Sequence, residues 1–66
     1  MFLYKIELEL PQERRAHVIV LADSDEKAFQ YAEPIIVRHY VAEPDIRQMA
    51  IIEKKRVEPG SGYVIE

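Results

Sequence analysis

Few side chains in this sequence could take part in catalysis. The only histidines are His17 and His39, and the only serines are Ser24 and Ser61, while Cys, Thr, Asn and Trp are absent. Nucleophilic and acid–base catalysis draw mainly on such side chains. An enzyme would need a histidine in a cleft, and a chain this small seldom contains a pocket of ~300 Å³ unless two copies build it between them. We therefore expect no catalytic residue and no enzymatic activity.

Two groups of residues could hold a metal ion, and each has a simpler explanation. His17 and His39 could join a carboxylate, but their spacing matches no compact zinc pattern. Asp23, Asp25 and Glu26 offer clustered oxygens of the kind that Mg²⁺ or Ca²⁺ prefers. The same three residues suit the start of a helix, where acidic side chains cap free N–H groups. We expect no metal and no cofactor.

Two basic clusters could bind an anion. They comprise Lys54, Lys55 and Arg56 near the C-terminus, and Arg14 and Arg15 near the first turn. If both clusters line one end of the sheet, they form a phosphate-binding edge. The alternative is that the C-terminal run protects a strand edge from aggregation and the other decorates a solvated turn. The net charge of −3 is a poor match for a nucleic-acid binder, so nucleic acid is not expected as the main partner.

Alternating hydropathy predicts the strands that would position these side chains. In residues 3–10, apolar side chains alternate with charged ones, which is typical of a half-buried strand. Residues 16–22 and 46–57 predict two further strands, and a polar connection at residues 11–15 predicts a hairpin. Pro and Gly at residues 58–61 predict a tight turn, after which residues 62–66 would return as a short fourth strand.

One helix is predicted between the second and third strands. Asp23 can cap its start, and Glu26 stands three residues later, as in a capping box. Apolar residues then follow at helical spacing: Ala28, Phe29, Ala32 and Ile36. Pro34 interrupts this pattern, so we expect a kink near Glu33 or two short helices, with the helical region ending by residue 42.

The order of the elements predicts one small α+β domain over residues 1–66. In a β-β-α-β-β chain, the first strand can lie between the second and third and pair antiparallel with both. The predicted sheet is four-stranded with strand order 2-1-3-4, and one kinked helix covers one face in a two-layer sandwich. A helix on one face leaves the other face of the sheet exposed.

The second and third strands are apolar on both faces, which predicts an interface. Whichever face the helix covers, apolar side chains remain on the other. The residues that we assign to this interface are Ile19, Leu21, Met49 and Ile51. A 66-residue chain without disulfides is usually marginal alone, so we expect a homodimer joined through sheet faces or edges. Scattered surface apolar residues are the simpler alternative.

Two stretches of the sequence resemble a known family. They are VIVLADSDEKAF at residues 18–29 and IEKKRVEPGSGYVI at residues 52–65. They resemble a short domain of unknown function from Bacillus-like Firmicutes. The resemblance implies a stand-alone cytoplasmic bacterial protein, and it implies no activity and no functional residue.

The sequence shows no signal for membrane insertion or secretion, and its features together favour an interaction protein. No apolar run approaches the ~20 residues of a membrane helix, and the N-terminus lacks the pattern of a signal peptide. We therefore expect a cytoplasmic location and no membrane partner. The hypothesis is a non-enzymatic, homodimeric module that binds a protein through a sheet face or edge. Weak nucleic-acid or anion binding through a basic strand end is the alternative.

Overall fold

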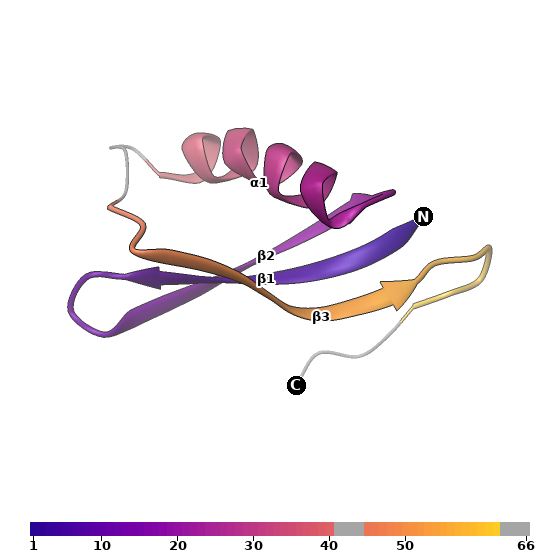
Figure 1. Cartoon of the computed structure of the whole chain (residues 1–66), viewed down its shortest axis with the longest axis horizontal. Coiled ribbons are helices and arrows are strands. Elements are labelled where there is room, and N and C mark those ends of the chain that lie inside the picture. Colours follow the sequence, from indigo (N-terminus) through magenta and orange to yellow (C-terminus); the bar gives the residue numbers. More distant parts are fainter. Residues whose placement is uncertain (41–44, 63–66) are drawn as a thin grey trace.

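The computed structural model describes residues 1–40 and 45–62. These residues form three strands and one helix: β1 (Phe2–Leu10), β2 (Arg14–Ala22), α1 (Asp25–His39) and β3 (Gln48–Arg56). Figure 1 shows α1 lying on one side of the sheet, so the structure has two layers. The predicted α+β class is confirmed, and so is the predicted position of the helix on one face of the sheet.

β1 is the central strand of the sheet and pairs with both of the other strands. The strand order is β2-β1-β3, and both pairs are antiparallel. Phe2 lies opposite Ala22 on one side and opposite Arg56 on the other. The 2-1-3 part of the predicted order is therefore confirmed.

The predicted four-stranded sheet is wrong, because the described residues form a sheet of three strands. The turn at residues 58–61 is present: Ser61 N–H donates to the Glu58 carbonyl over 2.8 Å, and Gly60 has a φ of 88°. After the turn, the Gly62 carbonyl accepts a hydrogen bond from Lys55 Nζ over 3.2 Å. The contact at Gly62 is therefore a side-chain hydrogen bond, whereas a fourth strand would need a series of backbone hydrogen bonds to its neighbour. Residues 63–66 of the predicted strand lie outside the described residues.

The core lies between α1 and the sheet. Tyr4, Ile6 and Leu8 of β1 are its largest fully buried side chains. The side chains from the other elements that pack against them are Val18, Val20, Ala22, Ala28, Ala32 and Ile36. Burying one large apolar side chain contributes about 1.5–3 kcal/mol. The small alanines on the inner face of α1 let the helix approach the strands closely.

The helix differs from its prediction at two positions. Ser24, and not Asp23, is the N-cap, since its Oγ accepts a hydrogen bond from Lys27 N–H over 3.2 Å. α1 also continues through Pro34 to His39, so the expectation of two short helices is wrong. Pro34 and Gln30 both lie on the exposed side of the helix. Water can therefore hydrate the Gln30 carbonyl, which loses its usual donor at the proline.

The β1–β2 hairpin closes with a tighter turn than predicted. Arg14 N–H donates to the Pro11 carbonyl over 3.4 Å, and β2 already begins at Arg14. Gln12 and Glu13 have φ values of 65° and 60°. Two consecutive positive φ angles define a type I′ turn, which matches the twist of antiparallel strands. Neither residue is glycine, so each pays the steric cost of the left-handed region.

This turn generates a stability prediction. Glu13→Gly should raise the free energy of unfolding by about 1 kcal/mol, because glycine adopts positive φ without the Cβ clash. Urea denaturation followed by circular dichroism measures the change. Glu13→Ala is the matched control, since it removes the same carboxylate but keeps Cβ. An equal gain in both variants would show that the charge, and not the backbone angle, limits stability.

Candidate protein-binding surfaces

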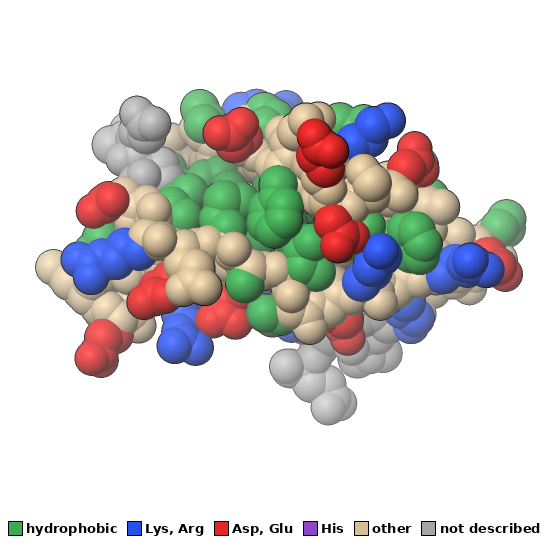
Figure 2. Space-filling model, viewed as in Figure 1, with side chains coloured by type: hydrophobic (Ala, Val, Ile, Leu, Met, Phe, Trp, Pro, Cys, Tyr) green, Lys and Arg blue, Asp and Glu red, His purple; other side chains and the backbone are tan. Residues whose placement is uncertain are grey.

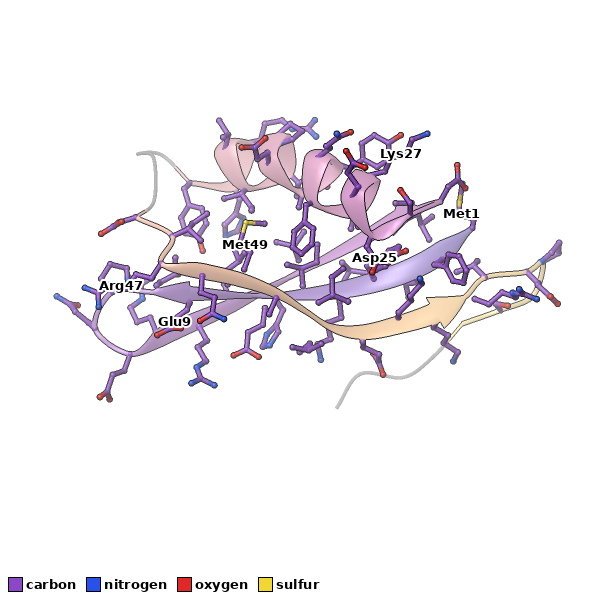
Figure 3. The ribbon with its side chains drawn as sticks, in the orientation of Figure 1. Met1, Glu9, Asp25, Lys27, Arg47 and Met49 are labelled. Atoms are coloured by element: carbon purple, nitrogen blue, oxygen red, sulfur yellow. The ribbon has the colours of Figure 1, made fainter. Side chains whose placement is uncertain are left out.

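Asp25 at the start of α1 ties the helix to two strands. Its Oδ1 accepts a hydrogen bond from Tyr4 Oη over 2.9 Å and from Lys54 Nζ over 3.1 Å. Lys54 Nζ also lies 4.4 Å from the centre of the Phe2 ring, a cation–π distance. In Figure 3, Asp25 lies between the first turn of the helix and the strands. One cation of the predicted anion site is therefore engaged within the fold.

The three polar groups at this contact stabilise each other's ionisation states. Hydrogen bonds from Lys54 and then from Tyr4 lower the pKa of Asp25. The hydrogen bond to Asp25 raises the pKa of Lys54. Burial raises the pKa of Tyr4, and its hydrogen bond to Asp25 acts in the same direction. At neutral pH the contact therefore joins a carboxylate, an ammonium group and a neutral phenol.

A β-bulge explains how Lys54 reaches Asp25. Ile6 lies opposite Ile51, whereas the preceding residue of β1, Lys5, lies opposite Glu53. Ile52 is therefore an extra residue in β3, and it reverses the alternation of side chains beyond it. Lys54 consequently lies opposite Tyr4, on the side of the sheet that faces α1.

The structure does not bring the two basic clusters together. Arg14 lies opposite Leu10, and Arg56 lies opposite Phe2, so the clusters stand at the two ends of β1. Eight residue steps along a strand separate them by about 27 Å. Arg15 forms an ion pair with Glu7 over 3.1 Å. The predicted arrangement, with all five basic residues at one end of the sheet, is not observed.

The two histidines border one hollow between β2 and the end of α1. Its volume is about 200 Å³, and both His17 and His39 line it. His17 Nε2 lies 4.0 Å from Glu7 Oε2, and the His39 ring packs edge-on against Tyr40. In the part of the chain that the structure describes, no three metal-ligating side chains converge.

The face of the sheet away from α1 carries an apolar patch at one end. This open-face patch consists of Leu3, Ile19, Leu21 and Val57, which border a hollow of about 390 Å³. Ile19 is 40% exposed and Leu21 is 47% exposed. Our interface prediction named these two residues and missed Leu3 and Val57. The sequence carried a signal for Leu3, because in the alternating first strand Leu3 lies on the same face as Lys5, which is the face away from the helix.

A second, partly apolar surface opens between α1 and β3. This β3 groove has a volume of about 550 Å³ and is lined by four apolar residues, Ile36, Val37, Ile46 and Met49, and by four polar ones, Glu33, Asp45, Arg47 and Gln48. Figure 2 shows apolar side chains gathered between the helix and β3, on the surface facing the viewer. In Figure 3, Met49 points from β3 toward the helix. Val37 is 62% exposed at the rim.

The four predicted interface residues therefore belong to different faces. Ile19 and Leu21 lie on the open face, whereas Met49 and Ile51 are half-buried and pack against the core beneath α1. The difference arises from register. Even-numbered residues of β2 face the helix, but odd-numbered residues of β3 do so before the bulge.

The described residues form a small two-layer α+β fold, in which one helix covers a three-stranded antiparallel sheet. The chain belongs to the family described as Protein of unknown function (DUF3906), whose profile matches residues 1–65. This confirms the predicted family resemblance, and no activity is attached to the family; the predicted taxonomic range stays a prediction. No curated protein and no solved structure matches the chain. Within the described residues, no helix is long and apolar enough to span a membrane.

The Asp25 contact generates a prediction for acid unfolding. The folded state holds the pKa of Asp25 below its ordinary value of 3.8, so the contact contributes stability above about pH 3.8. That contribution is lost as the pH falls through the lower, folded-state pKa. Asp25→Asn should lower the melting temperature at pH 7, and the difference from wild type should shrink as the pH falls below 3.8.

Thermal unfolding between pH 2 and pH 7, followed by circular dichroism, measures this effect. Asp23→Asn is the matched control, because it removes an exposed carboxylate two residues away. A deficit for Asp25→Asn that stays constant down to pH 2 would contradict the assignment.

Proposed function

We propose that this chain is a non-catalytic interaction module that forms homodimers and binds a protein partner through the open-face patch. The observation that carries the proposal is the apolar end of a sheet face that α1 leaves uncovered. A cytoplasmic location in a bacterial cell is part of the same proposal.

The chemistry of the patch supports protein binding. An antiparallel sheet with one solvated face normally keeps that face polar, and Lys5, Glu7 and Glu9 obey this rule on β1. The open-face patch departs from it at one end only. Contiguous exposed apolar side chains with a polar border are typical of interaction sites. Lys55 stands at the border of this patch, where it lies opposite Leu3.

The roles of three hydroxyl groups support a non-catalytic function. Ser24 Oγ caps α1, and Ser61 Oγ accepts a hydrogen bond from Glu58 N–H over 2.9 Å in the turn after β3. The buried Tyr4 hydroxyl donates to Asp25. Each of these groups is used in holding the fold.

The geometry favours this proposal over anion binding. The basic clusters stand at opposite ends of β1, and the Asp25 carboxylate neutralises Lys54. Neighbouring acidic residues, Glu53 and Glu58, further weaken the field of the C-terminal run. A phosphate-binding surface needs several cations converging on one site.

The homodimer predicts the molar mass in solution. Light scattering after gel filtration should give about twice 7.7 kDa across a dilution series. The reason is that a second copy would cover apolar surface that a chain of this size otherwise leaves in water. A mass of one chain at every concentration would refute the homodimer.

The open-face patch predicts where a protein partner makes contact. A photoreactive benzoylphenylalanine that replaces Leu21 should give a discrete heavier adduct in cells, and Ile19→Asp in the same chain should abolish it. Tyr31 on α1 is the matched control position, since it is 45% exposed against 47% for Leu21. Thermal unfolding confirms that each variant is folded. Equal adducts from both positions, or none from Leu21, would refute binding through the patch.

A further inference from the structure

We infer that the two copies associate through their β3 edges, which pair antiparallel about a two-fold axis at Ala50. This inference rests on the proposed homodimer and assigns its geometry. It leaves the open-face patch to a different protein.

The position of α1 singles out the β3 edge. As far as the structure describes the chain, the sheet has two edge strands, β2 and β3. α1 packs chiefly against β2, so the helix-facing side of the sheet is more open beside β3, where the β3 groove lies. Among residues 1–40 and 45–62, no strand pairs with the outer side of β3. An uncovered edge presents unpaired N–H and C=O groups, which pair readily with another strand.

The sequence of β3 limits which part of the edge can pair. Charged side chains fill the half that follows the bulge, from Glu53 to Arg56, and both features discourage pairing there. Residues 48–52 carry no charge. The midpoint of this stretch is Ala50, so a symmetric pair of strands is centred there.

Charge favours the antiparallel arrangement over a parallel one. Parallel pairing would stack the basic runs of the two copies side by side. Antiparallel pairing about Ala50 places those runs at opposite ends of the interface and brings Arg47 of each copy to the Glu53 end of the other. Opposite charges then meet where like charges would otherwise repel.

The β3 groove gives this contact an apolar component. In the proposed register, Met49 of each copy lies opposite Ile51 of the other, on the side of the sheet that faces the helices. Both residues are half-buried in one copy and pack against its core, and Met49 borders the groove. The second β3 therefore covers the open flank of the groove, and each copy does this for the other, as two-fold symmetry requires.

The absence of cysteine in the chain permits a direct test. Residues opposite each other in an antiparallel pair have Cα atoms about 4.5–5.5 Å apart, within the range of a disulfide. Under mild oxidation, Ala50→Cys should form a covalent dimer at least tenfold faster than Ile19→Cys, whose side chain lies on the open face. Gln48→Cys and Ile52→Cys should also cross-link more slowly than Ala50→Cys. In the proposed register, each of these cysteines is displaced along the strand from the same cysteine of the other copy.

The outcomes separate this geometry from the homodimer itself. A cross-link that forms fastest at Ala50, in a chain whose mass is that of a dimer, supports the inference. Fastest cross-linking at Ile19, Gln48 or Ile52, or none in a dimeric chain, overturns the β3 geometry while the homodimer stands. A chain that stays monomeric by light scattering overturns both.

Discussion

In residues 1–40 and 45–62, one helix of 15 residues has to cover the apolar side of three nine-residue strands. An α-helix is about 10 Å wide, and three strands at ~4.8 Å spacing are wider once side chains are included. α1 resolves this by packing over β1 and β2, where Tyr4, Ile6 and Leu8 become fully buried. The β3 side of the same layer is left partly open, and the β3 groove is the consequence.

The contact at Asp25 and the bulge in β3 depend on each other. Without the extra residue at Ile52, Lys54 would point to the open face, and the start of α1 would lose its link to the third strand. The bulge also divides β3 into an uncharged half and a charged half. In the charged half, Lys54 binds Asp25 and Lys55 binds the Gly62 carbonyl, whereas the uncharged half keeps a free edge among the described residues.

The two apolar surfaces lie on different sides of the sheet, so the proposed partners do not compete. A second copy at the β3 edge would extend the sheet sideways, and the open-face patch would remain accessible in each copy. Such a dimer would present two equivalent patches related by symmetry. Bivalent presentation raises the apparent affinity for a partner that carries two binding segments.

Local pattern determined a large part of this fold. The alternation in residues 3–10 predicted β1, the helical spacing of Ala28, Ala32 and Ile36 predicted the buried face of α1, and the chain order predicted the arrangement 2-1-3. Tertiary structure alone decided the bulge at Ile52, the separation of the basic clusters and the division of the predicted interface between two faces. The physical reason is that periodicity fixes which residues share a face within one strand, whereas the register between strands is set by pairing and packing across the sheet.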